Sequence, residues 1–255
     1  MRLPVALLAM AACSHGDPAP KPSEPLPWAP NHGWMVDVKH LVTAIGDDWT
    51  STKVRLTRWE RKSFGDPWHR VGEPWDGVIG TSGMGWGDGL HGNGAPSGLD
   101  GPVKREGDRR APAGAFEVAT VFGYDEDNRS IADHPYMHLT DATECVDDPR
   151  SAAYNTIVEH TGSADWTSSE HMRRDDDLYS LGAVIEHNPQ NVRGDGSCIF
   201  FHVWSGPDST TVGCTAMDKQ KLASMLSWLG DDSLFVQLPR AEYRAVQDHW
   251  GLPPQ

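Results

Sequence analysis

Short hydrophobic runs separated by turn residues fill the first half of the chain. Residues 41–45 are apolar and end at a Gly-Asp-Asp turn, and in residues 53–59 apolar side chains alternate with charged ones. Residues 75–80 form a third run of this kind. A strand with one buried face has a hydrophobic period of two, and turn residues end it. The pattern therefore predicts antiparallel β-strands over these three segments.

The second half of the chain holds the strongest strand candidates. Residues 181–185 and 198–204 are rich in aliphatic and aromatic residues and bracket a turn region at 188–196. Such composition favours strands, and Asn, Pro and Gly favour the turn between them. Residues 234–238 predict a last strand.

One helix is clearly marked after residue 217. Asp218 is of the type that caps a helix, and Gly230 is of the type that ends one. The apolar residues between them recur at helical spacing, at Leu222, Met225, Leu226 and Leu229. A shorter helical segment is predicted over residues 241–250. The elements together predict a mainly β, β-rich α+β fold with a few short helices.

A glycine-rich stretch covers residues 81–101. Gly-rich loops can cradle phosphates, but here no Gly-Lys-Ser/Thr follows and no clear helix opens after the stretch. We therefore expect a solvent-exposed loop.

The first 33 residues predict export and tethering. Residues 1–12 combine an early Arg, an apolar stretch and small residues directly before Cys13, which looks like a bacterial lipoprotein signal with Cys13 as the lipidated residue. An ordinary secretory signal or a cytosolic start are the alternatives. Residues 13–33 are proline-rich and predict an extended tether. Residues 34–255 are expected to form one domain.

The charge balance excludes some functions. The 255 residues contain 22 Lys+Arg and 36 Asp+Glu, a formal net charge of -14, and no basic run. Such a chain would repel a nucleic-acid backbone, so nucleic acid is not an expected partner. After the first dozen residues no apolar run approaches the ~20 residues of a membrane-spanning helix.

Four cysteines raise the question of which thiol is free. If Cys13 carries a lipid, Cys145, Cys198 and Cys214 remain, and an oxidising compartment would tend to pair two of them. The residues alone leave all three pairings open.

Candidate nucleophilic chemistry lies between residues 197 and 217. His202 stands near the end of a predicted strand, and Cys214 follows Gly213 shortly before the predicted helix. A thiol becomes a good nucleophile as thiolate, which a neighbouring imidazole favours, and a glycine allows backbone N–H groups to approach an oxyanion. The alternative is a satisfied core histidine and a buried or disulfide-bonded cysteine.

The run G-S-C-I-F-F-H-V-W followed by T-T-V-G-C-T-A-M resembles the catalytic stretch of the L,D-transpeptidase catalytic-domain family, with a strand-borne His, a spacer and Ser/Thr-x-Gly-Cys. Matching segments of one branch lie upstream: G-P-V-K-R-E-G-D-R-R-A-P-A-G-A-F from residue 101, C-V-D-D-P-R-S-A-A-Y-N from residue 145 and V-I-E-H-N from residue 184. The resemblance covers residues 36–238 and implies a β-sandwich or barrel.

The resemblance implies a cysteine enzyme that acts on peptidoglycan stem peptides without a cofactor or metal. Cys214 would attack the L-centre carbonyl of a tetrapeptide stem and release D-alanine, and His202 would keep the thiol ionised and later protonate the leaving amine. The third partner of the imidazole would be a nearby backbone carbonyl. Transfer of the acyl group to an amine of another stem gives L,D-transpeptidation, and transfer to water gives L,D-carboxypeptidase action. The implied setting is a monomer lipid-anchored in the bacterial cell envelope.

The resemblance also suggests substrate-binding and oxyanion residues. Gly213 and Cys214 would supply the oxyanion N–H groups, and Thr211, Trp204 and Asn188 would contact the substrate.

The sequence departs from better-known members of the family at two positions. Val203 replaces a Gly after the His, and Ala216 replaces an Arg that would hold a substrate carboxylate. Lys104 or Arg105 is a candidate substitute, although solvated surface charges are the favoured interpretation.

With Cys214 as nucleophile, we predict a disulfide between Cys145 and Cys198. Cys198 lies four residues before His202 on the predicted strand, and an even separation places both side chains on one face of the sheet. Cys198 is therefore expected near the active site.

Two rival functions use other residues. A zinc peptidase would use His134 and His138 with Asp133, Cys145, Asp147 or Asp148, although Pro135 disturbs the spacing and no H-E-x-x-H is present. A non-catalytic wall-binding lipoprotein would offer tryptophan faces to sugars, although packing is the commoner role of Trp in β-rich domains. The candidates are Trp34, Trp49, Trp59, Trp68, Trp75, Trp86, Trp166 and Trp204.

Overall fold

The computed structural model describes residues 33–127 and 134–255. The predicted signal at 1–12, Cys13, nearly all of the predicted tether at 13–33, and Asp133 lie outside the described residues. Within the described part no helix is long and apolar enough to cross a membrane.

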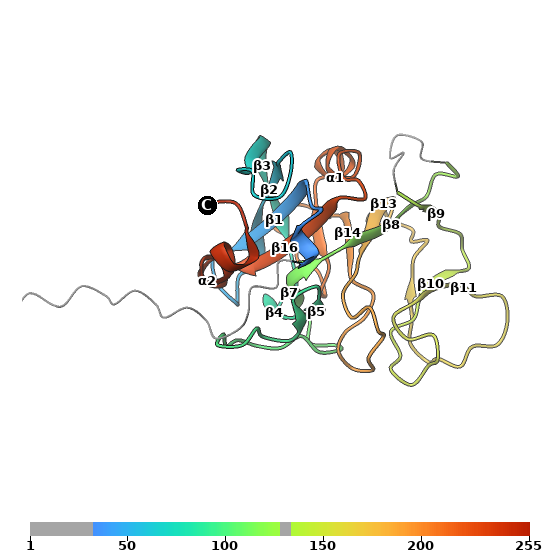
Figure 1. Ribbon diagram of the computed structural model, residues 1–255. Coiled ribbons are helices and arrows are strands. Elements are labelled where there is room, and N and C mark those ends of the chain that lie inside the picture. Colours follow the sequence, from blue (N-terminus) through green and yellow to red (C-terminus); the bar gives the residue numbers. More distant parts are fainter. Residues whose placement is uncertain (1–32, 128–133) are drawn as a thin grey trace, which may run out of the picture.

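A large mixed sheet organises the described residues, which confirms the predicted mainly β class (Figure 1). Its strand order is β4-β7-β16-β1-β2-β3-β15-β14-β13-β8-β9. The strands are β1 (His40–Gly46), β2 (Lys53–Glu60), β3 (His69–Val78), β4 (Met84–Trp86), β7 (Ala111–Phe116), β8 (Val118–Gly123), β9 (Tyr136–His138), β13 (Leu181–Ile185), β14 (Phe200–Val203), β15 (Thr215–Met217) and β16 (Ser233–Pro239).

The sheet combines antiparallel and parallel pairs. β1, β2 and β3 are antiparallel neighbours, as the alternating pattern predicts. β1 pairs with β16 in parallel, and β14 pairs with β15 in parallel. Parallel neighbours come from distant parts of the chain, which local periodicity cannot reveal.

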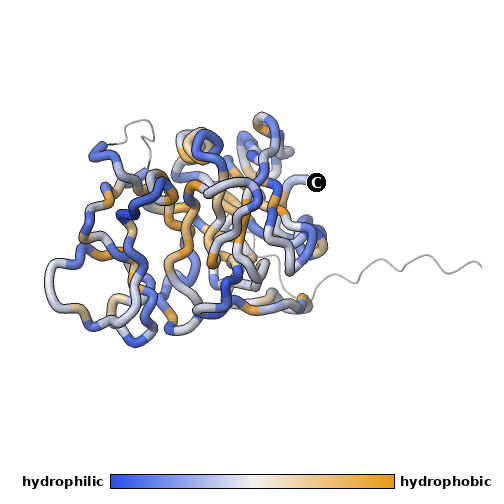
Figure 2. Tube along the Cα trace, turned by 180° about the vertical axis from the view of Figure 1, so that it is seen from behind, coloured by the Kyte–Doolittle hydropathy of each residue, from blue (hydrophilic) through white to orange (hydrophobic). Residues whose placement is uncertain are grey.

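The sheet curls so that strands distant in its order face a shared core. Phe201 of β14 and Phe235 of β16 are separated by four strands in the sheet order, yet their ring centroids are 4.6 Å apart. The buried cluster they belong to includes Leu41, Leu56 and Trp86. In Figure 2 the hydrophobic stretches follow these central strands and hydrophilic residues dominate the periphery.

Smaller elements complete the described part. β10 (Thr143–Cys145), β11 (Ile157–Glu159) and β12 (Glu170–His171) form a three-stranded sheet, and β5 (Asp88–Gly89) pairs with β6 (Gly92–Asn93). The helices are α1 (Lys219–Leu226), α2 (Arg240–Trp250) and a 3-10 turn, η1 (Gly33–Met35). In Figure 1 the β10 and β11 strands stand at the edge of the molecule beyond β8 and β13.

Both predicted helices are present with small differences at their ends. The Asp218 carboxylate accepts hydrogen bonds from the backbone N–H groups of Gln220 and Lys221, as expected of a cap. α1 ends at Leu226, before the expected stop at Gly230, although Leu229 remains buried.

The glycine-rich stretch differs from the predicted exposed loop. Residues 83–88 are buried, and β4 pairs in parallel with β7. A Cβ added at Gly85 would lie 3.0 Å from the backbone nitrogen of Lys104. Glycine at this position lets two backbone segments approach closely. Composition alone does not distinguish this role of glycine from its role in flexible loops.

The described tryptophans mainly pack. Trp75, Trp86 and Trp250 are buried, and Trp34, Trp49, Trp59, Trp68 and Trp228 pack against the main core. Several indole N–H groups have internal partners, including the Trp59 donor to Thr43 Oγ1 at 3.0 Å. Packing therefore accounts for most of the tryptophan content.

Candidate active site

His202 lies on β14, and Cys214 directly precedes β15, the parallel neighbour of β14. In the β14–β15 register His202 is opposite Ala216, and Cys214 precedes Ala216 by two residues. Side chains two residues apart along a strand share a face, so the imidazole and the thiol project to the same side. Phe200 belongs with Cys214 to the second hydrophobic cluster, whereas Phe201 belongs to the main core.

The turn before Cys214 is closed by Thr211. Its Oγ1 donates to the Cys214 carbonyl at 2.7 Å and accepts from the Gly213 N–H at 3.1 Å. The expected oxyanion role of the Gly213 N–H is therefore not supported, because this group donates within the turn. Thr211 positions the nucleophile through these bonds, which differs from the expected substrate contact.

The Cys214 thiol is free and buried, with 4% of the residue exposed. Sγ accepts from the Phe200 N–H at 3.3 Å and lies 3.5 Å from the Cys198 carbonyl oxygen. Burial, followed by the nearby charge of Glu170, raises the pKa of Cys214 far above its ordinary value. The resting group is a neutral thiol.

His202 is held as a neutral base. Its Nδ1 lies 2.7 Å from the Val203 carbonyl oxygen, which can only accept, so Nδ1 carries the proton and Nε2 carries the lone pair. This carbonyl is a partner of the kind that the sequence suggests. Burial lowers the pKa of His202 to about 4. Burial disfavours the charged form of both groups, which argues against the expected preformed thiolate at rest.

A cavity of about 290 Å³ opens beside Cys214. Residues distant in sequence form its wall, and each comes from a segment singled out above or from near β12: Lys104, Glu106, Gly107, Arg109, Asp147, Ser169, Glu170, Ser197, Cys198, Ile199, Val212 and Gly213. The convergence of the 101, 145 and 197 segments places charged groups of both signs around one nucleophile.

Lys104 corrects the interpretation of residues 104 and 105 as solvated charges. Lys104 is 4% exposed, lines the cavity and donates from Nζ to Asp108 Oδ1 at 2.7 Å. Arg105 is exposed and pairs with Asp195. Arg109, which sequence reasoning missed, is exposed at the cavity, and no carboxylate of the described residues forms an ion pair with it.

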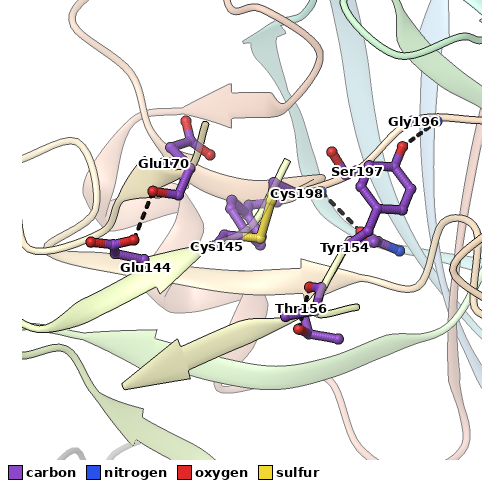
Figure 3. The surroundings of a disulfide bond; sticks show 12 residues. Glu144, Cys145, Tyr154, Thr156, Glu170, Gly196, Ser197 and Cys198 are labelled. Carbon is purple, nitrogen blue, oxygen red and sulfur yellow. Dashed lines mark hydrogen bonds between the residues drawn. A yellow bond between two sulfur atoms is a disulfide. The ribbon is translucent and has the colours of Figure 1, made fainter. Parts of the chain in front are cut away.

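The Cys145–Cys198 disulfide forms one edge of this site (Figure 3). The sequence predicts Cys198 within a strand over residues 198–204, but it lies two residues before β14 and has a φ of 55°. Its N–H donates to Asn155 Oδ1 at 3.0 Å. Cys198 nevertheless lines the cavity beside Cys214, as expected. It does so from the loop before β14 and not from the strand itself.

Two expected substrate contacts are not available at the cavity. Asn188 is fully buried with a φ of 56°, and its side chain bonds the backbone of Val192 and Gly196. It stabilises a loop. Trp204 is half-buried directly after β14, and its backbone N–H donates to the Met217 carbonyl. It is not among the residues lining the cavity.

The residues considered for zinc are largely engaged elsewhere. Cys145 is in the disulfide, and the Asp148 carboxylate accepts from Arg150 and Thr167. Among the described residues, no group of three or more His, Cys, Asp or Glu side chains is placed to hold a metal. His134 and His138 are half-buried near β9.

Tyr179 and Glu170 complete the site and carry no sequence signal. The Tyr179 ring packs edge-on against His202 with centroids 5.2 Å apart, and its hydroxyl donates to Glu170 Oε1 at 2.6 Å. Both residues lie in turn-rich stretches where no periodicity or motif marks them. Their proximity to Cys214 results from the packing of β12 and β13.

Comparison of the chain with protein-family models, curated proteins and solved structures finds no match. The functional argument therefore depends on the residues and geometry described above.

Proposed function

We propose that this protein is a cysteine-dependent L,D-transpeptidase of peptidoglycan, as its motifs suggest. The observation that carries the proposal is the meeting of three separate motif segments around one free thiol, with an imidazole on the adjacent strand. Structural cysteines do not need a base on the same face or a cavity lined by charged groups.

The first half-reaction is acylation of Cys214. As Sγ forms a bond to the L-centre carbonyl carbon of a tetrapeptide stem, His202 Nε2 takes the thiol proton. The oxyanion collapses, the bond to the terminal D-alanine breaks, and the imidazolium returns the proton to the leaving nitrogen. Because the resting pair is neutral, proton transfer accompanies attack and the charge develops only once substrate is bound.

Arg109 is the proposed partner of the substrate carboxylate. The family position for such an Arg is Ala216, which is fully buried within β15, so no guanidinium at that position could reach a ligand without repacking. Arg109 presents at the same cavity a guanidinium that forms no ion pair with any described carboxylate, and it can bind the terminal carboxylate of the donor stem there.

The proposed setting is the bacterial envelope. A disulfide of low exposure supports an oxidising compartment, and the motif at Cys13 supports a lipid anchor there. Peptidoglycan stem peptides are the proposed partners.

The test incubates the protein with disaccharide-tetrapeptide and follows products and protein mass. We expect an acyl adduct on Cys214, loss of D-alanine and cross-linked dimers, all abolished in Cys214→Ala and by prior thiol alkylation. Full activity of Cys214→Ala would overturn the proposal. Trimmed stems without dimers would indicate carboxypeptidase action, binding without turnover would indicate a wall-binding protein, and loss of activity only with a chelator would indicate the zinc enzyme.

A further inference from the structure

Three carboxylates face the cavity beside Cys214, and they differ in how far they are already engaged. Glu106 accepts from the hydroxyls of Tyr154 and Ser197 at 2.5 and 2.6 Å. Asp147 has a buried Oδ1 without a hydrogen-bond partner. Glu170 accepts on Oε1 from Tyr179, and none of the described side chains forms an ion pair with it. The cavity wall also carries Lys104 and Arg109, but these three carboxylates can accept hydrogen bonds from a positively charged group.

Glu170 is fixed relative to the nucleophile by the fold. Its Cα is opposite Cys145 in the β10–β12 register, so the disulfide and the ladder hold it beside Cys198. Figure 3 shows Glu170 on one side of the disulfide and Tyr154 on the other. The residue lines the cavity and is also partly exposed, so its carboxylate has a route to water.

The two fates of the proposed acyl-enzyme differ in the number of protons to be removed. Hydrolysis forms the carboxyl C–O bond and breaks the C–S bond, and one water proton passes through His202 to Sγ. An ammonium acceptor has three N–H bonds and the product amide has one. Two protons must therefore leave: one restores the thiol through His202, and the other needs a second base.

We propose that Glu170 is this second base, a catalytic residue that takes the extra proton from an ammonium acceptor and releases it to solvent. Asp147 Oδ1 would accept another N–H of the same ammonium. The role rests on the proposed acyl transfer from Cys214. It makes Glu170 specific for transfer to amines, because hydrolysis does not need it.

Electrostatics around Glu170 support a base of this kind. Burial raises the pKa of its carboxyl, while the hydrogen bond from Tyr179 acts in the opposite direction. A base with a pKa moved toward that of its substrate is more effective. The charged or titratable groups that face Glu170 are Asp147, Arg174, Glu106, Tyr179 and Cys214.

The test compares Glu170→Gln with the unsubstituted protein, using disaccharide-tetrapeptide as donor and two acceptors. One acceptor is a second tetrapeptide stem, whose amine is protonated at neutral pH, and the other is hydroxylamine, which is mostly unprotonated there. We expect the transfer-to-hydrolysis ratio with the stem acceptor to fall by about 100-fold, the range of general base catalysis. With hydroxylamine the ratio should stay within about twofold, because this acceptor has no extra proton to lose.

Glu144→Gln is the matched control. Glu144 is the neighbouring carboxylate on β10 and accepts from Ser169 and Trp166, but it does not line the cavity. We expect its transfer ratio to be unchanged. Tyr179→Phe keeps the ring against His202 and removes the hydroxyl that holds Glu170, so the stem-acceptor ratio should fall.

Each remaining outcome contradicts the role of Glu170. An unchanged ratio with the stem acceptor in Glu170→Gln, or an equal fall with both acceptors, would overturn it while leaving the proposed function intact. If the unsubstituted protein forms no acyl-enzyme, the proposed function itself fails and the role of Glu170 falls with it.

Discussion

Asn155 joins the disulfide to the loop behind the cavity, and replacing it tests how the site is held. Its Oδ1 accepts from the Cys198 N–H at 3.0 Å. Its Nδ2 donates to the carbonyls of His187 and Asn188 at 3.3 and 3.0 Å and to Asn191 Oδ1 at 3.0 Å. One side chain thus connects three segments of the backbone.

Asn155→Gly removes these bonds without adding backbone strain. Asn155 has a φ of 59°, which glycine adopts freely and alanine does not, so glycine isolates the side-chain contribution. A net value of about 1 kcal/mol for each hydrogen bond, reduced where water replaces the partner, gives a loss of about 2 to 4 kcal/mol. Urea unfolding under non-reducing conditions measures this change. A loss below about 0.5 kcal/mol would refute the reasoning, because it would mean that these bonds carry no net stability.

Asn155→Asp tests the polarity of the same network. The carboxylate keeps the bond from Cys198 N–H but faces three oxygen acceptors where Nδ2 donated. These oxygens would raise the pKa of the new carboxyl in the folded state above the unfolded value of about 3.9. Stability relative to the native chain should therefore be best preserved below pH 3.9 and fall as the pH rises through the folded-state value. A variant as stable as the native chain at pH 7 would contradict the assigned bonds.

Three further predictions concern the site directly. Because the pKa of His202 is lowered to about 4, acylation should lose its rate as pH falls through about 4, and an acid limb near the ordinary value of 6.5 would argue against a buried neutral base. Replacing both Cys145 and Cys198 by Ser removes a disulfide that spans 53 residues. The loop-entropy relation gives a loss of about 4 kcal/mol in the free energy of unfolding, measured in urea. A loss below about 1 kcal/mol would contradict this estimate. Arg109→Gln should raise KM for the tetrapeptide with little change in kcat, whereas Arg105→Gln, whose partner is Asp195, should leave both constants unchanged; equal effects of the two would remove the carboxylate role of Arg109.

Helices and strands are predicted well where the residues that determine them are close together in the sequence. The strand at residues 181–185 and the Asp218 cap are present where expected, because alternation and capping are properties of neighbouring residues. The glycine-rich stretch fails for the opposite reason. Met84 and Trp86 become buried because β7, which begins 25 residues later, pairs with them, and no local pattern contains that partner.

The candidate site divides in the same way. The sequence identifies Cys214 and His202 because a short motif places both residues within one segment. It misses Tyr179 and Glu170 because long-range packing brings them to His202 and to the cavity, and neither belongs to a spaced pattern. Arg109 lies within a quoted motif segment, but the motif does not show which of its charged side chains faces the cavity. The sequence suggests Asn188 as a substrate-binding residue. Polarity alone does not distinguish such a residue from a buried one whose side chain hydrogen-bonds the backbone of its own loop.

Burial of Cys214 would also protect the proposed enzyme from side reactions. A thiol next to a disulfide exchanges with it through its thiolate, and the rate follows the thiolate fraction. Cys214 shares a hydrophobic cluster with both cysteines of the disulfide, yet its raised pKa keeps that fraction minimal at rest. In the proposed mechanism His202 removes the proton only as an acyl carbon arrives, which would confine reactivity to the bound complex. The same desolvation that makes Cys214 a poor free nucleophile therefore preserves the Cys145–Cys198 bond that shapes its cavity.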